Sequence, residues 1–205
     1  MPRMSATYSP RRVPETRTLV VRGLRHHVTF WPGDGPPIVL LHGFMDCGAT
    51  FQFLADVLAS ERPLFAPDWR GFGRSQWSPG GYWFADYFGD LDALLDECVP
   101  SAPVDIVGHS MGGNIALGYA GLRPERVRRL VTLEGFGLPD ATPDLAPTRY
   151  REWLEQLRQP QAASVFPTLE TLATVLRKRN PRLPADRAMF VAREWSEPLP
   201  DGRAR

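Results

Sequence analysis

A serine flanked by two glycines is the feature of this sequence with the clearest chemistry. Residues 104–113 read V-D-I-V-G-H-S-M-G-G, in which a short apolar run leads directly into a Gly-x-Ser-x-Gly motif. The small residues at 114–121 favour a helix immediately after it. A strand that turns sharply into a helix at such a motif presents the serine hydroxyl at the end of a sheet. Ser110 is therefore the candidate nucleophile.

The two glycines of the motif have a mechanical role in this interpretation. A Cβ atom at Gly108 or Gly112 is expected to strike the neighbouring strand and helix, so only glycine permits so tight a turn. The backbone N–H of Ser110 then faces the start of the helix, where free N–H groups and the helix dipole favour a negative charge. The motif thus predicts a nucleophile beside an anion-stabilising position.

The base that such a serine needs is not evident. A serine hydroxyl is a weak nucleophile until a base removes its proton, and here the chain order is serine, acid, histidine. The four histidines, His26, His27, His42 and His109, all precede Ser110. The sequence therefore carries a nucleophile without an evident base.

Composition places the chain among ordinary globular proteins. Of its 205 residues 43% are hydrophobic and 11% aromatic, and the net charge of +1 argues against nucleic-acid binding. Cys47 and Cys98 give neither a disulfide framework nor metal-ligand spacing. No apolar run could span a bilayer, and no apolar segment of a signal peptide follows Arg11 and Arg12. We expect a cytoplasmic protein with no metal, no other cofactor, no nucleic-acid partner and no membrane span.

Apolar patterning predicts alternating strands and helices in the first two thirds of the chain. Helices are expected at 49–59, 82–98 and 114–121, and strands at 18–22, 26–31, 38–41, 63–67, 104–107 and 127–133. The first two strands read as an antiparallel pair, and the rest as a parallel sheet with helices on both faces. In the helix at 82–98, spacing places Leu91, Leu94 and Leu95 inside and Asp90, Asp92 and Asp96 outside.

The pattern changes at about residue 139. Three amphipathic helices are expected there, at 148–157, 169–179 and 185–195. They form an inserted helical lid, or the pattern is misleading and these segments are the next elements of the sheet. The predicted organisation is a ragged N-terminus (1–17), a core (18–138) and a lid (139–205).

Three motifs at expected strand ends carry a family resemblance. They are L-H-G-F at 41–44, D-W-R-G-F-G-R-S at 68–75 and G-H-S-M-G-G at 108–113, with Leu133-Glu134-Gly135 after the next strand. In this order they resemble the serine-nucleophile branch of the α/β-hydrolase fold superfamily. The resemblance implies an α/β fold with a helical lid and two further strands that carry the acid and the histidine. We expect a chain truncated before those strands.

The resemblance also implies roles for individual residues. The backbone N–H groups of Phe44 and Met111 are the expected oxyanion donors, and Gly43 lies in the same loop. His42 is expected to hold that loop rather than to act as a base. Glu134 stands where some branches place the catalytic acid, and otherwise it is a pocket-wall or loop-anchoring carboxylate.

Other residues of the motifs are expected to be structural. Asp68 and Arg70 should hold the glycine-rich loop, and His26 and His27 should be ordinary strand residues. The aromatic side chains near that loop fit either a pocket or core and lid packing; they are Trp69, Trp77, Trp83 and Phe84.

The expected function is hydrolysis of an acyl bond in a small molecule, a carboxylic ester, thioester or lactone, through an acyl-enzyme. The alternative is a catalytically incomplete fragment or a non-enzymatic homologue that lacks the histidine. The strand at 127–133 should leave an apolar, unpaired sheet edge, through which the chain could self-associate.

Overall fold

A six-stranded sheet organises the chain in the computed structural model, which describes residues 8–58, 62–100, 102–137, 142–158 and 164–205. The strand order is β1-β2-β4-β3-β5-β6. The strands are β1 (Glu15–Val21), β2 (Leu24–Trp31), β3 (Ile38–Leu41), β4 (Leu64–Pro67), β5 (Val104–His109) and β6 (Val127–Leu133). β1 and β2 pair antiparallel, β2 joins β4 antiparallel, and the pairs β4–β3, β3–β5 and β5–β6 are parallel. The predicted mostly parallel sheet is confirmed.

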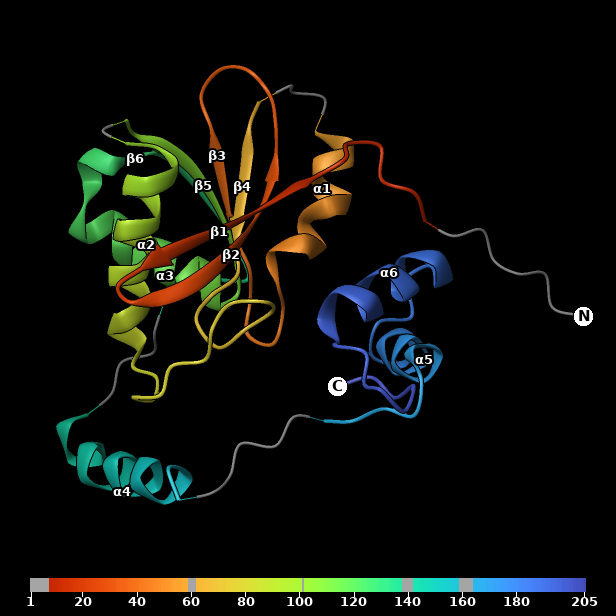
Figure 1. Cartoon of the computed structure of the whole chain (residues 1–205). Helices are drawn as coiled ribbons and strands as arrows, with labels where there is room; N and C mark the ends of the chain where they lie inside the picture. The colour runs from red at the N-terminus through yellow and green to blue at the C-terminus, as the bar shows by residue number, and fades with distance from the viewer. Residues whose placement is uncertain (1–7, 59–61, 101, 138–141, 159–163) are drawn as a thin grey trace, which may run out of the picture.

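Helices cover both faces of this sheet (Figure 1). On one face α2 (Phe84–Cys98) and α3 (Met111–Leu122) pack on alternate strand residues such as Val39 and Ile106. On the other face α1 (Gln52–Val57) covers Ile38 and Leu40. Successive residues of a strand therefore point to opposite faces of the sheet and build two apolar layers, as expected for strands buried on both faces.

The N-terminal end of the described chain is more ordered than the sequence indicates. β1 begins at Glu15, three residues before the expected strand, because Glu15, Thr16 and Arg17 continue the register opposite β2. Before it, the backbone N–H groups of Arg11 and Arg12 donate to Asp56 Oδ1 of α1 at 3.0 and 2.9 Å. The ragged segment expected at 1–17 is thus corrected from residue 8 onward, and residues 1–7 lie outside the described residues.

The C-terminal third is helical, as predicted. It contains α4 (Ala146–Gln156), α5 (Leu169–Arg179) and α6 (Ala185–Trp195), and its described residues add no strand to the sheet. α5 and α6 pack on each other through an apolar cluster that includes Leu172, Leu176 and Val191. In Figure 1, α5 and α6 lie together beside α1, whereas α4 stands apart below the N-terminal end of α2.

β6 forms one end of the strand order and exposes apolar side chains. Val131 is 50% exposed and Leu133 is 45% exposed, and no strand pairs with the outer edge of β6 in the described residues. An unpaired edge strand with exposed apolar side chains is a template for pairing with another chain.

We expect this edge to drive self-association, and Val131→Lys to suppress it by placing a charge on the edge. In sizing chromatography the unmodified chain should elute larger as its concentration rises, and the variant should elute as a monomer. Val20→Lys on the opposite edge strand is the matched control, since Val20 is 70% exposed. If the unmodified chain stays monomeric at every concentration, the predicted self-association through β6 is wrong.

Candidate active site

The candidate nucleophile lies in a strained turn between β5 and α3. Ser110 has φ 50° and ψ −115°, a conformation that side-chain-bearing residues rarely adopt. Its N–H donates to the carbonyl of Leu133 at 2.8 Å, and its carbonyl accepts from Asn114 N at 3.0 Å. These two backbone bonds tie the turn to β6 and to α3, so the strain is held by the surrounding fold.

The glycines of the motif are required for this turn, as predicted. A Cβ atom on Gly108 would lie 2.6 Å from the carbonyl oxygen of Gly112, at the start of α3. A Cβ atom on Gly112 would lie 2.3 Å from the carbonyl oxygen of Leu41, at the end of β3. Both separations are far below van der Waals contact, so α3 can approach β3 and β5 only because these positions lack side chains.

The loop after β3 approaches the nucleophile at Gly43. A Cβ atom on Gly43 would lie 3.2 Å from Ser110 Cβ and 2.9 Å from His109 Nδ1. The structure therefore brings Gly43 and Ser110 together. Phe44 follows Gly43 with a side chain that is 67% exposed, and Met111 is the first residue of α3. The roles of the Phe44 and Met111 N–H groups as oxyanion donors remain predictions.

His42 supports this loop and has no ring nitrogen free for catalysis. Its Nε2 accepts from the backbone N–H of Trp69 at 2.9 Å, so the ring proton sits on Nδ1, which lies 2.7 Å from the carbonyl oxygen of Gly43. The Trp69 indole N–H also donates to the His42 carbonyl at 3.0 Å. Burial lowers the pKa of His42 and keeps the ring neutral.

Asp68 connects the loop after β4 to the loop after β3. Its Oδ1 accepts from Gly48 N at 2.7 Å, and its Oδ2 accepts from Arg74 N at 2.9 Å and lies 3.1 Å from His27 Nδ1. Burial acts to raise the pKa of Asp68, but the hydrogen bonds, that from His27 foremost, outweigh it and the pKa is lowered. Asp68 thus stays ionised and holds both loops by charge-assisted hydrogen bonds.

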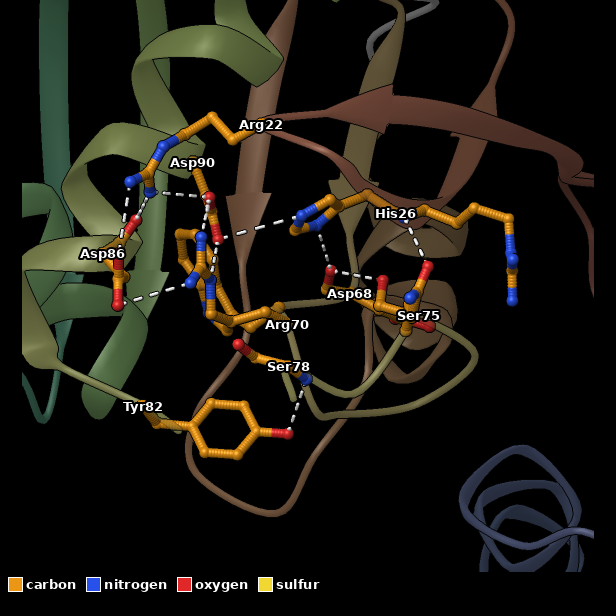
Figure 2. Close-up of polar contacts among 12 residues, drawn as sticks. Arg22, His26, Asp68, Arg70, Ser75, Ser78, Tyr82, Asp86 and Asp90 are labelled. Carbon is orange, nitrogen blue, oxygen red and sulfur yellow. Dashed lines mark hydrogen bonds and ion pairs between the residues drawn. The ribbon is translucent and has the colours of Figure 1, made fainter. Parts of the chain in front are cut away.

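Asp90 corrects one sequence prediction. Helical spacing placed it on the outer face of α2, yet it is fully buried. Arg70 donates two hydrogen bonds to its carboxylate, from Nε to Oδ2 at 2.5 Å and from Nη2 to Oδ1 at 2.6 Å. Arg22 Nη1 donates a third to Oδ1 at 3.1 Å. Figure 2 shows His26 on the other side of this carboxylate, with Nε2 3.8 Å from Asp90 Oδ2. The charge is buried because two arginines meet it there.

Glu134 and His109 form a contact that sequence reasoning missed. Glu134 follows β6 with φ 56°, and its carboxylate lies 3.9 Å from His109 Nε2. The Glu134 side chain is 79% exposed and the His109 side chain is 41% exposed. The alternation of side chains along β5 and β6 gave no signal for this pair, because both residues lie at the strand ends where the alternation stops. In the described residues Ser110 Oγ makes no hydrogen bond to an imidazole.

The aromatic residues near the site divide between core and surface. Trp69 is fully buried, and Phe84 packs against the core of α2 and α3. Trp77 and Trp83 are about half exposed, and Trp83 contacts α4. Trp69 and Phe84 thus follow the core-packing alternative, and Trp83 packs on a helix of the C-terminal segment.

α6 is fastened to the loop that follows β3. The indole N–H of Trp195 donates to Asp46 Oδ1 at 2.9 Å, and Glu194 accepts from Arg74 at 2.9 Å. Asp46 Oδ1 also accepts from the N–H of Cys47 at 2.8 Å. The helical segment thus contacts the same loop that places Gly43 beside Ser110.

The described residues contain no group of three or more His, Cys, Asp or Glu side chains placed to hold a metal ion. Within those same ranges, no helix has both the length and the apolar character to cross a membrane.

Comparison with known proteins identifies the family. A sequence profile of the alpha/beta hydrolase fold matches residues 36–198. The chain belongs to the α/β-hydrolase fold family. The resemblance to the α/β-hydrolase fold superfamily is confirmed, and so is the expected α/β fold class, while the serine-nucleophile branch stays a prediction.

Individual relatives agree with this family. A serine hydrolase-like protein of Danio rerio is 33% identical over 144 residues, which are 69% of this chain and 44% of that protein. Lipase LipV of Mycobacterium tuberculosis is 41% identical over 110 residues, 53% of this chain and 41% of the lipase. The solved thioesterase domain from the curacin biosynthetic pathway superposes with a TM-score of 0.84 at 26% identity, over 94% of this chain and 69% of that domain. The chain spans less than half the length of the two curated relatives.

Acid should destabilise this α/β-hydrolase chain through its buried neutral histidines. Burial lowers the pKa of His42 and of His26 in the folded state, whereas the same side chains in the unfolded chain take up protons near pH 6.5. Stability is therefore retained above about pH 6.5 and falls as the pH drops below it, by up to about 1.4 kcal/mol per pH unit for each group.

Urea unfolding between pH 5 and 7 measures this effect, in a range above the usual carboxylate pKa values. His42→Gln should be less stable at pH 7 by about 1–3 kcal/mol, because hydrogen bonds to Trp69 and Gly43 are disturbed. Its stability should nevertheless depend less steeply on pH than that of the unmodified chain. Equal pH slopes for the two proteins would show that His42 does not titrate with unfolding.

Proposed function

We propose that this chain is a serine hydrolase that acts on an acyl bond of a small molecule, a carboxylic ester, a thioester or a lactone. The observation that carries the proposal is the strained Ser110 turn, with Gly43 of the β3 loop against it. A non-glycine residue keeps a φ of 50° only where the surrounding fold enforces that conformation, and such backbone strain concentrates at functional sites. The names of the relatives, a lipase and a thioesterase domain among them, support the same class of reaction.

In the proposed reaction Ser110 Oγ attacks the substrate carbonyl carbon and its proton passes to a base. The carbonyl oxygen gains a negative charge, which the N–H groups of Phe44 and Met111 stabilise; one such donor is worth about 10²–10³ in rate. The tetrahedral intermediate then collapses, the alcohol or thiol takes up a proton and leaves, or in a lactone stays on the opened acyl chain, and Ser110 keeps the acyl group. Water attacks the acyl-enzyme, releases the acid and restores the hydroxyl.

The base in this scheme is an imidazole that the described residues do not bring to Ser110. His42 is excluded because both ring nitrogens are engaged. Glu134 is the candidate acid: a carboxylate acts by fixing the tautomer and orientation of the imidazole. Its position at the end of β6, on the strand whose Leu133 carbonyl binds Ser110 N, supports this role.

Two further parts of the proposal concern the surroundings of the site. We assign residues 139–205 to a helical lid over the core, supported by the hydrogen bonds that join α6 to Asp46 of the β3 loop and to Arg74 of the loop after β4. Cys47 and Cys98 are free thiols, which supports a cytoplasmic location.

The missing imidazole favours a second candidate, a chain that is catalytically incomplete by itself. The two candidates predict different reactivity toward a fluorophosphonate, which phosphonylates only a serine whose proton a base removes. Intact mass therefore separates them without knowledge of the natural substrate.

The proposed hydrolase predicts one probe added to each chain and its loss in Ser110→Ala, whereas the catalytically incomplete chain predicts no adduct. Ser164→Ala is the matched control, because Ser164 is exposed and belongs to the segment before α5. Gly43→Ala should slow labelling, since its new Cβ would crowd Ser110 Cβ at 3.2 Å. A folded chain that stays unlabelled without added base, whether or not external imidazole restores labelling, would refute the proposed activity and establish the incomplete chain.

A further inference from the structure

Six aromatic side chains connect the candidate nucleophile to α4. We call them the aromatic track, and they are Phe44, Phe72, Tyr82, Trp83, Tyr150 and Trp153. They come from three separate segments, the β3 loop, the loop after β4 and helix α4. Ring contacts join Phe44 to Phe72, and Trp83 to Tyr150 and Trp153, while Tyr82 lies against Gly71 between these two groups in the chain.

The first step lies beside the nucleophile. Gly43 is close enough to Ser110 that an added Cβ would lie 3.2 Å from Ser110 Cβ, and Phe44 is the next residue. The Phe44 ring packs edge-on against Phe72, with ring centroids 5.4 Å apart. Phe44 remains 67% exposed, so most of its apolar surface faces outward next to the site.

The second step crosses the loop after β4. Gly71 precedes Phe72 and has φ 78°, and a Cβ there would lie 2.6 Å from the Tyr82 ring. The Tyr82 ring therefore lies against the backbone of Gly71, the residue before Phe72. Its hydroxyl accepts from the N–H of Ser78 at 3.1 Å, which holds the ring in this orientation (Figure 2).

The third step reaches α4. Trp83 follows Tyr82, and its ring lies 5.1 Å from the Trp153 ring and 6.1 Å from the Tyr150 ring. Leu157, one residue beyond α4, approaches to within 4.0 Å of a Cβ added on Gly81. Trp83 is 48% exposed and Tyr150 is 54% exposed, so the contact leaves apolar surface uncovered.

The chemistry of the track selects its occupant. None of its six side chains is a carboxylate, an ammonium or a guanidinium, and large exposed apolar surface on a monomer marks a binding site. Because the track begins at the residue whose N–H is assigned to the substrate carbonyl oxygen, its occupant is a group attached to that carbonyl. We propose that the aromatic track binds the acyl arm of the substrate, a linear apolar chain well beyond the length of acetyl. This inference rests on the function proposed above.

Octanoate and acetate test the track without any need for catalysis, because each is the free acid that an acyl-enzyme would release. Equilibrium dialysis below the micelle-forming concentration gives their affinities for the unmodified chain. Each buried methylene should tighten binding about three- to fourfold, so octanoate should bind far more tightly than acetate.

Trp83→Ala should weaken octanoate binding by about tenfold or more and leave acetate binding unchanged, because it removes the ring that links the β4 loop to α4. Val20→Ala, at an exposed apolar position on β1 away from the track, is the control. Tyr150→Ala is a second variant on α4 and covers the case in which Trp83→Ala fails to fold by circular dichroism. Octanoate binding no tighter than acetate, or unaffected by the track variants, would overturn the inference.

The outcome is separable from that of the fluorophosphonate experiment. Octanoate binding that depends on Trp83, in a chain that the probe does not label, would retain the track and refute the proposed activity. Labelling of Ser110 with no preference for octanoate would retain the activity and refute the track.

Discussion

The close approach of α3 to β3 is the constraint on which the rest of the site depends. No atom larger than hydrogen fits between Gly112 and the carbonyl of Leu41, so helix and strand share one contact surface at their ends. The turn between β5 and α3 must reverse within a few residues to allow this, and Ser110 takes the positive φ that results. The hydroxyl is therefore presented by packing rather than by any hydrogen bond of its own.

A second set of interactions transmits this geometry to the loops. Asp68 binds Gly48 N in the loop after β3 and Arg74 N in its own loop, while Trp69 binds both the ring and the carbonyl of His42. Since all these partners are buried or partly buried, losing one would leave an unpaired polar group, which costs about 1–3 kcal/mol. The β3 loop next to Ser110 is thus positioned from β4 as well as from β3.

Sequence patterns could anticipate the sheet, the helices and the serine turn, because each depends on local periodicity or on glycines with a steric purpose. The bounds of α5 and α6 follow from the same periodicity. Asp90 shows where this reasoning ends. Helical spacing treats an aspartate as an outer residue, and only the tertiary fold reveals that Arg70 and Arg22 converge on it. The contact of His109 with Glu134 likewise joins the ends of two strands whose relative register no local pattern encodes.

The helices of the C-terminal segment are attached to the core in two different ways. α5 and α6 bury an apolar cluster of their own, and α6 hydrogen-bonds to Asp46 of the β3 loop and to Arg74 of the loop after β4. α4 has no buried residue and meets the core through the rings of Trp83, Tyr150 and Trp153. Because apolar burial supplies most of the free energy that docks a helix, α4 is held far less firmly than α5 and α6. A bound acyl arm along the same rings would add apolar contact where α4 has least, so substrate binding and docking of α4 should reinforce each other.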